Sequence, residues 1–304
     1  MNKIIVIVGP TAVGKTDLSI ALAKKLNTEI ISADSVQIYE GLDIGSAKPS
    51  SDEMQGVRHH MISCVKATAP YSVSDFESSA SKWIDRLHAE GKIPVIVGGT
   101  GLYVNSLLYE MNFGQSCADE AFRIKMEQLA ERDGKEAVHA LLKAVDPVAA
   151  ERIHANNLKR VIRALEINHV TGNPTSDFAS EPEKTQKYEV ILIGLTRPRE
   201  VLYERINRRV EMMVDAGLID EVKKLKNSGL DDSFQSMQGI GYKEVLNYID
   251  GISTYEQMKD AVKQASRNYA KRQMTWFKRY AEIRWIDLEI STTESALESI
   301  LSLI

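Results

Sequence analysis

The chain has 304 residues, of which 43% are hydrophobic and 26% charged, a composition typical of a globular protein large enough for two domains. No segment approaches the roughly 20 consecutive apolar residues of a transmembrane helix, so we expect no membrane span. The formal net charge of −4 argues only weakly against nucleic-acid binding, because such binding depends on local basic patches.

The first hundred residues alternate strand and helix patterns. Apolar runs predict strands at 3–8, 29–34 and 93–97, and helical periodicity covers 15–26 and 75–90. The first run is too short and too rich in β-branched residues for a signal peptide, so we interpret it as a buried strand. Strands that alternate with helices favour a parallel α/β sheet.

A different pattern begins at about residue 112. Helical periodicity recurs there without an intervening strand, and a polar stretch at 174–187 is expected to be a loop. The helices expected in this region are 119–132, 135–145, 147–154 and 157–171. We therefore predict an all-helical insertion domain over residues 112–186.

The α/β pattern returns with a buried strand at 189–195. We predict that residues 1–111 and 187–304 together form one core, a parallel sheet flanked by helices, which the insertion interrupts. The helices expected after the last strand are 199–216, 218–228 and 254–281.

The turn between the first strand and the first helix fits the phosphate-binding pattern G-x-x-x-x-G-K-[ST]. Its glycines let the backbone fold around an anion, and exposed N–H groups at the helix N-terminus attract phosphate. Lys15 adds a point charge, and the Thr16 hydroxyl is a candidate ligand for Mg²⁺. An ordinary glycine-rich turn is the alternative, but the flanking strand and helix favour a P-loop for a diphosphate or triphosphate. The loop residues are Gly9, Pro10, Thr11, Ala12, Val13, Gly14, Lys15 and Thr16.

Two further strands end in polar residues. Asp34 follows the second strand, and Gly98-Gly99-Thr100-Gly101 follows the third. The carboxyl ends of parallel strands form the edge where open α/β sheets bind ligands. Asp34 is therefore a candidate general base near the P-loop, with helix capping or support of Mg²⁺ as its alternative roles. Thr100 can hydrogen-bond a ligand there, whereas an ATPase usually has a metal-binding Asp at such a strand end.

Several long motifs resemble those of the bacterial tRNA dimethylallyltransferases, also called tRNA isopentenyltransferases. The most specific are Asp-Ser-Val-Gln-Ile-Tyr at 34–39 and Gly-Leu-Asp-Ile-Gly-Ser-Ala-Lys-Pro at 41–49. The resemblance extends over nearly the whole chain. Other matching segments are 98–103, 163–166, 205–209, 237–244 and 269–277.

The resemblance implies that dimethylallyl diphosphate is the donor and that the acceptor is the N6 amine of the adenine just 3′ of the tRNA anticodon. It implies that Asp34 accepts the amine proton, that Thr100 contacts the reacting groups and that Lys15 stabilises the leaving diphosphate. Arg205 and Arg209 lie four residues apart on one helix face, and one or both are expected to bind the diphosphate. A solvated basic face is the alternative for this pair. Mg²⁺, at Thr16, is the expected cofactor.

The resemblance also implies two groups of tRNA contacts. A stacked base must be extruded into a pocket, and Asp34, Ser35, Val36, Gln37 and Thr100 are expected to surround it. Gln37 offers both a donor and an acceptor. For the basic residues of the insertion, which would hold the RNA backbone, a solvated helix face is the alternative. The contacts expected in the insertion are Arg123, Lys159, Arg160, Val161, Ile162 and Arg163.

The C-terminal region is locally basic. Residues 257–285 carry eight Lys and Arg and two acidic residues, a local net charge of +6. Lys263, Arg267, Lys271 and Lys278 fall near one face of the expected helix, which would follow tRNA phosphates with a salt-dependent affinity. The aromatic residues of this helix fall near another face and are expected to belong to the core.

Two other classes of protein remain open. A small-molecule P-loop kinase would use ATP, and a non-catalytic, nucleotide-switched RNA-binding protein would need a γ-phosphate sensor that we do not identify. Whether ATP binds the P-loop stays open as well. Cys64 and Cys117 form no metal-binding pattern and nothing indicates secretion, so we expect reduced thiols in a cytoplasmic protein. Nothing in the sequence requires more than a monomer.

Overall fold

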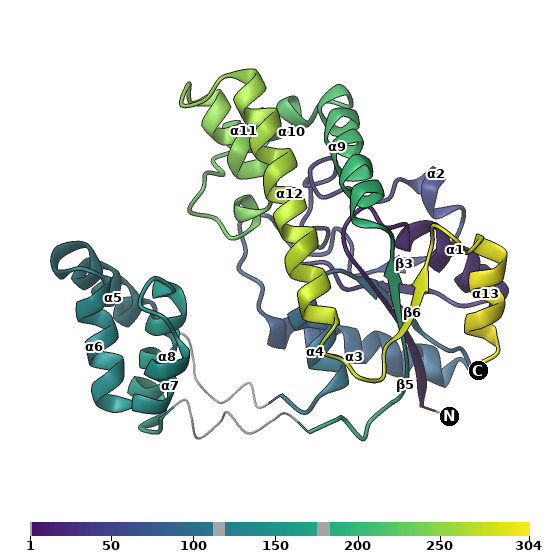
Figure 1. Ribbon diagram of the computed structural model, residues 1–304, viewed down its shortest axis with the longest axis horizontal. Helices are drawn as coiled ribbons and strands as arrows, with labels where there is room; N and C mark the ends of the chain where they lie inside the picture. Colours follow the sequence, from purple (N-terminus) through teal and green to yellow (C-terminus); the bar gives the residue numbers. More distant parts are fainter. Residues whose placement is uncertain (1, 112–118, 175–182) are drawn as a thin grey trace. The chain divides into compact units, whose positions relative to one another are not determined.

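The computed structural model describes residues 2–111, 119–174 and 183–304 (Figure 1). Parts of the predicted insertion, 112–118 and 175–182, therefore lie outside the described residues, as does Cys117. Cys64 is a free, exposed thiol.

The chain divides into two compact units. Met1–Leu108 and Thr185–Ile304 form the first, which we call the α/β unit. Tyr109–Lys184 form the second, which we call the helical unit. Each unit has its own buried core, so each is described separately.

A six-stranded parallel sheet with the strand order β3-β2-β4-β1-β5-β6 forms the centre of the α/β unit. The α/β class predicted from the sequence is therefore confirmed. Every residue of β1 is buried, which explains its uninterrupted apolar sequence. The strands are β1 (Lys3–Val8), β2 (Ile30–Ser32), β3 (His59–His60), β4 (Val95–Gly98), β5 (Glu189–Thr196) and β6 (Arg284–Asp287).

The register of the strands brings three polar segments to one edge of the sheet. Val8 of β1 lies opposite Gly98 of β4, and Ser32 of β2 lies opposite Val97. The segments that follow these strands are the P-loop, Asp34 and Gly99–Thr100. They leave the sheet as neighbours at its carboxyl edge, the usual ligand-binding edge of such sheets.

Helices flank this sheet. The predicted helices α1, α3, α9, α10 and α12 are present, and within the described residues no helix has the length and apolarity needed to cross a bilayer. The helices of the α/β unit are α1 (Lys15–Lys25), α2 (Ser51–Met54), α3 (Val73–Ala89), α4 (Gly101–Leu108), α9 (Arg199–Asp215), α10 (Leu218–Asn227), α11 (Tyr242–Ile249), α12 (Tyr255–Phe277) and α13 (Thr293–Leu301), with a 3-10 turn at Ser236–Gln238.

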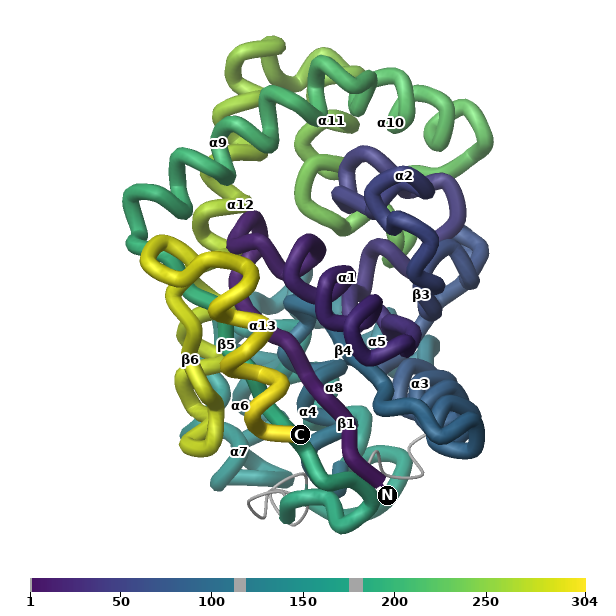
Figure 2. Tube along the Cα trace, turned by 90° about the vertical axis from the view of Figure 1, so that its right-hand side faces the viewer, coloured from purple at the N-terminus to yellow at the C-terminus, as the bar shows by residue number. Residues whose placement is uncertain are grey.

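Buried clusters of the described residues stabilise the α/β unit, and two of them position its helices. The first joins the sheet to α1 and α13, which lie beside each other (Figure 2), and it includes Leu22 and Ile300. The second joins the loop after β2 to α9, α10, α11 and α12, and it includes Leu42, Leu218 and Tyr242. Burial of each such side chain stabilises the fold by roughly 1.5–3 kcal/mol. The second cluster fixes the loop that follows Asp34 against the C-terminal helices.

The described residues of the helical unit form four helices around a small core that includes Val138, Leu142 and Val161. Gly134, with φ at 90°, joins the first two helices in a conformation that favours glycine. Asp146 caps the third helix by accepting a hydrogen bond from the Ala149 amide at 2.9 Å. The helices are α5 (Glu120–Asp133), α6 (Lys135–Val145), α7 (Pro147–Arg152) and α8 (Leu158–Thr171).

Two neighbouring chain segments connect the units. Tyr109 and Lys184 form an antiparallel bridge. The Glu110 amide donates to the Glu183 carbonyl at 2.8 Å, and the Thr185 amide donates to the Leu108 carbonyl at 2.9 Å. The chain therefore leaves the α/β unit and returns to it at one place.

Candidate active site

The P-loop connects β1 to α1 at the carboxyl edge of the sheet. Gly14 caps α1 with φ at 113°, a value that L side chains rarely adopt. Gly9 passes so close to β5 that a Cβ atom would lie 2.7 Å from the Leu195 carbonyl oxygen. Both glycines of the motif are thus required by the path of the backbone.

Cationic side chains hold the carbonyl groups of the P-loop. Lys15 Nζ donates to the Gly9 and Pro10 carbonyls at 2.9 and 2.8 Å. Arg205 Nε donates to the Ala12 carbonyl at 2.8 Å, and Arg197 Nε donates to the Val13 carbonyl at 3.0 Å. Among the described residues the Ala12 and Gly14 amides have no protein acceptor, so they remain for an anion.

A glutamine from the C-terminal region contacts the same loop. Gln273 Oε1, on α12, accepts a hydrogen bond from the Thr11 amide at 2.9 Å. Its Nε2 donates to the Gly99 carbonyl at 3.0 Å. We expected the Thr11 amide to bind phosphate, but Gln273 already occupies it. Nothing in the local sequence around Gln273 predicts this role, because the two partners lie 262 positions apart.

The side chains of Lys15 and Arg209 lie close together at the P-loop. Arg209, half-buried on α9, donates from Nη1 to the Thr11 hydroxyl at 3.4 Å. Burial lowers the pKa of Arg209, and Arg205 lowers it further. Burial and the nearby Arg209 lower the pKa of Lys15 to about 7, although Asp34 opposes this shift. An anion bound between these cations would offset their repulsion, so this place is a candidate anion site.

Asp34 and Thr100 lie at adjacent strand ends beside the P-loop. Asp34 Oδ1 accepts hydrogen bonds from the Val36 and Gln37 amides at 2.9 and 3.2 Å. Thr100 Oγ1 accepts one from the Ser35 amide at 3.0 Å. Within the described residues Asp34 Oδ2 has no hydrogen-bond partner, so it can act on a ligand while Oδ1 keeps the side chain in place.

A pocket of about 420 Å³, open to solvent, joins these groups. The lining includes both the phosphate-binding and the acidic elements predicted from the sequence. Among the lining residues are Lys15, Thr16, Ser32, Asp34, Gln37 and Gly98.

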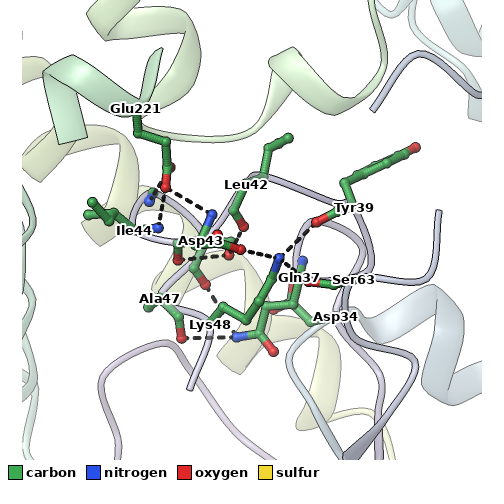
Figure 3. A network of polar contacts seen from close by, with 12 residues as sticks. Asp34, Gln37, Tyr39, Leu42, Asp43, Ile44, Ala47, Lys48, Ser63 and Glu221 are labelled. Atoms are coloured by element: carbon green, nitrogen blue, oxygen red, sulfur yellow. Dashed lines mark hydrogen bonds and ion pairs between the residues drawn. The ribbon is translucent and has the colours of Figure 1, made fainter. Parts of the chain in front are cut away.

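The side-chain amide of Gln37 already forms hydrogen bonds within the protein at both its nitrogen and its oxygen. Its Nε2 donates to the Ser46 and Ala47 carbonyls at 3.2 Å each, as Figure 3 shows for Ala47. Its Oε1 accepts a hydrogen bond from Ser32 Oγ at 3.2 Å. The expectation that Gln37 offers both a donor and an acceptor is therefore wrong, because the donor is already used. The acceptor remains.

The tRNA contacts predicted in the helical unit divide into three kinds. Lys159 and Arg160 are exposed at the start of α8. Val161 and Ile162 are buried in the core, which excludes contact through their side chains and corrects the prediction for this pair.

Arg123 and Arg163 bind one acidic side chain. Both donate to the fully buried Glu166, at 2.8 and 2.6 Å. Burial alone would raise the pKa of Glu166, but the hydrogen bonds from these arginines lower it overall. Arg123 and Arg163, which were predicted to contact tRNA, therefore have a structural role in pairing with Glu166.

The predicted basic face of α12 is also partly wrong. Lys263 pairs with Glu211 of α9, and Arg267 Nη1 donates to Asn207 Oδ1 at 2.6 Å. These two side chains fasten α12 to α9. Lys271 and Lys278 are exposed.

Few groups suit a metal ion in the described part of the chain, where no cluster of three His, Cys, Asp or Glu side chains occurs. His60 has structural contacts: its ring stacks on Trp83 with centroids 3.7 Å apart, and its Nε2 contacts Glu29. Thr16 lines the pocket with Lys15 and Asp34. Mg²⁺ commonly takes one or two protein oxygens plus phosphate oxygens, so this donor set fits Mg²⁺ together with a diphosphate.

The fold and the site together define an α/β protein with a P-loop and a carboxylate at the same edge of a parallel sheet. The model of the IPP transferase family matches residues 37–280. The chain belongs to the IPP transferase family. The match covers Gln37 and the arginines of α9 but begins after the P-loop.

Individual relatives agree with this assignment. A tRNA dimethylallyltransferase of Clostridioides difficile is 53% identical over 292 residues, which are 95% of this chain and 93% of the relative. One from Alkaliphilus oremlandii is 48% identical over 99% of this chain and 96% of its own length.

Solved structures share the fold. A tRNA isopentenylpyrophosphate transferase of Bacillus halodurans matches with a TM-score of 0.75 and 46% identity, over 100% of this chain and 96% of that one. A eukaryotic dimethylallyltransferase acting on tRNA matches with a TM-score of 0.82 and 29% identity, over 100% of this chain and 80% of that one.

Proposed function

We propose that this protein transfers a dimethylallyl group from dimethylallyl diphosphate to the N6 amine of the adenine 3′ of the tRNA anticodon. The observation that carries the proposal is one pocket lined by both the P-loop Lys15 and the carboxylate of Asp34, in a member of the IPP transferase family. The names of the relatives support the same reaction.

The P-loop and its cations would act on the leaving group. As the allylic C–O bond breaks, its electron pair goes to the diphosphate, whose negative charge increases. The free amides of the loop, Lys15 and Arg209 can stabilise that charge where it develops. Of the two arginines, Arg209 is the better ligand, because Arg205 is exposed and hydrogen-bonded to the Ala12 carbonyl. Mg²⁺, held by Thr16 and the diphosphate, would supply further positive charge at this point.

Asp34 would act on the nucleophile. An adenine amine is a poor nucleophile, because its lone pair is delocalised into the ring. Its proton becomes acidic only once the C–N bond has begun to form, so a carboxylate is a sufficient base. Asp34 Oδ1 is held by two backbone amides, which leaves Oδ2 to accept the proton. Thr100, beside Asp34, is proposed to contact the reacting groups.

The exposed residues Lys159 and Arg160 are the proposed contacts to the tRNA backbone. Phosphate contacts of this kind position an RNA without reading its sequence. Asp34, Ser35 and Val36 would surround the extruded base. We also propose that the protein acts as a monomer, and a tRNA substrate implies a cytoplasmic location.

A label-transfer assay tests the proposal. Purified protein is mixed with Mg²⁺, unmodified tRNA and dimethylallyl diphosphate labelled in the allyl group, with and without ATP. We expect label in the RNA at the same rate in both samples. Unlabelled RNA together with ATP-dependent phosphorylation of a small molecule would instead identify a P-loop kinase.

A further inference from the structure

The loop that follows β2 is held by a single glutamate from a distant helix. Glu221 Oε2, on α10, accepts hydrogen bonds from the Asp43 and Ile44 amides at 3.0 and 2.7 Å (Figure 3). Its Oε1 accepts from the Gly45 amide at 3.1 Å and from the Tyr242 hydroxyl at 2.8 Å. Hydrogen bonds to a charged acceptor are stronger than those between neutral groups. Glu221 therefore fixes the backbone of residues 43–45, in the middle of the segment 42–48, which we call the 42–48 loop.

Two further contacts leave this loop little freedom. Tyr242 is fully buried, and a Cβ atom at Gly45 would lie 2.6 Å from its ring. The nearly buried Lys48 side chain donates to the Tyr39 carbonyl at 2.8 Å and to Ser63 Oγ at 2.7 Å. The loop is thus packed at one end and hydrogen-bonded at the other.

The 42–48 loop in turn fixes the orientation of the Gln37 amide. Gln37 Nε2 donates to the carbonyls of Ser46 and Ala47, which belong to this loop. A backbone carbonyl only accepts hydrogen bonds, so the nitrogen must face the loop and the oxygen must face away from it. The oxygen receives one hydrogen bond from Ser32 and keeps a second lone pair on the pocket that Asp34 also lines.

We propose that Glu221 is a positioning residue that makes the pocket selective for a base with an exocyclic amine. Acting through the 42–48 loop, it holds Gln37 so that the pocket presents two acceptors, Gln37 Oε1 and Asp34 Oδ2. The two N–H groups of the adenine amine match them. A carbonyl at the same position of the base would face two acceptors and be rejected. This inference rests on the proposed function, because it assumes that an adenine enters this pocket.

The test compares RNA binding without donor, so it does not depend on turnover. Anticodon stem-loop hairpins carry either adenine or hypoxanthine, which has a carbonyl in place of the amine, at the target position. The ratio of their dissociation constants is measured for the wild type and for Glu221→Gln. We expect adenine to be favoured by about tenfold or more in the wild type, as is usual for one mismatched base contact, and the preference to shrink several-fold in Glu221→Gln.

Three further variants separate positioning from general damage. Asp220→Asn, on the same turn of α10, removes the same charge without a bond to the loop and should keep the wild-type ratio. Tyr242→Phe removes one hydrogen bond to Glu221 and should reduce the ratio by a smaller factor, which covers the case in which Glu221→Gln does not fold. In a Gln37→Ala background, Glu221→Gln should have no further effect on the ratio, because the two residues act in series.

The proposal is overturned if Glu221→Gln, folded, keeps the wild-type ratio, or if the two changes are additive. Equal weakening of both hairpins would assign Glu221 a purely structural role and also overturn it. Failure of the proposed function would look different. In that case the wild type would not transfer label to RNA, whatever the hairpin ratio.

Discussion

Gln273 accepts a hydrogen bond from the Thr11 amide at 2.9 Å and so connects the long helix α12 to the P-loop. The other end of the same side chain donates to the Gly99 carbonyl, at the next strand end. One amide thus holds two of the three segments that form the pocket. The Gln273 side chain lies directly against the backbone of Gly99, because a Cβ atom at Gly99 would lie 2.1 Å from Gln273 Nε2.

We expect Gln273→Ala to raise the KM for the diphosphate donor by about tenfold, the effect of losing one or two hydrogen bonds of roughly 0.5–1.5 kcal/mol each. Without the Gln273 contact, part of the binding free energy of the donor would be used to order the P-loop, which raises the KM. Steady-state kinetics with saturating tRNA measure the effect. Thr275→Ala, an exposed change on the same helix, is the control, and equal KM values for the two variants would remove Gln273 from donor binding.

Asp34→Asn should lower the single-turnover rate by roughly 10²–10⁴-fold, the usual contribution of a general base. An asparagine oxygen can still accept from the Val36 and Gln37 amides, so the side chain should stay in place. The dissociation constants for tRNA and donor should change little for the same reason. A variant with the wild-type rate would show that another group takes the proton.

Diphosphate affinity should fall as the pH rises above neutrality. Burial and Arg209 lower the pKa of Lys15 to about 7, so its ammonium loses a proton between about pH 6 and 8 in the free enzyme. A bound diphosphate favours the charged form and raises this pKa, so binding at pH 8 should take up a proton. The dependence approaches tenfold per pH unit above the free pKa.

Calorimetric titration with pyrophosphate between pH 6 and 9 measures this effect. Lys15→Met provides the background that comes from titration of pyrophosphate itself. The difference in log affinity between the wild type and Lys15→Met should be largest and constant at low pH, where Lys15 is charged, and should narrow as the pH rises above about 7. Parallel profiles over the whole range would mean that Lys15 stays charged.

The affinity for tRNA should depend on salt partly through the helical unit. Lys159→Ala and Arg160→Ala should each weaken tRNA binding and reduce the slope of log K against log salt by about 1, as expected for one lost phosphate contact. Lys263→Ala should leave the slope unchanged, because Lys263 pairs with Glu211. A reduced slope in Lys263→Ala alone would reverse this assignment of the two basic groups.

Much of the fold follows from local signals. β1, the P-loop and α1 carry an apolar run, a glycine motif and a helical period in adjacent segments, and each lies where it was predicted. The four helices of the helical unit also coincide with their predicted ranges within a few residues. Strands β3 and β6 were missed, because His59–His60 and Arg284–Asp287 have no apolar period. Pairing with a neighbouring strand, rather than composition, determines them.

The helix α4 was missed for a related reason. It begins at Gly101, in a segment that reads as a glycine-rich turn. A Cβ atom at Gly101 would lie 2.4 Å from Trp276, so tertiary packing requires the glycine. Local propensity therefore pointed the wrong way.

The site could be predicted only where its residues lie in continuous motifs. Lys15, Asp34 and Thr100 follow strand ends, and the register of a parallel sheet brings strand ends together. Glu221, Gln273 and Arg197 bind backbone groups more than 170 positions away, so no local pattern marks them. Nor does a basic sequence distinguish Lys263, paired with Glu211, from the exposed Lys271.

The paired segments at Tyr109 and Lys184 make the helical unit an insertion whose first and last residues are neighbours. Its two ends are already hydrogen-bonded neighbours, so a short turn between them would close the chain without crossing the sheet. Within the described residues, all six strands and the lining of the Lys15–Asp34 pocket belong to the α/β unit. The helical unit can therefore change in sequence or length while the strands and the pocket lining of the α/β unit stay as they are.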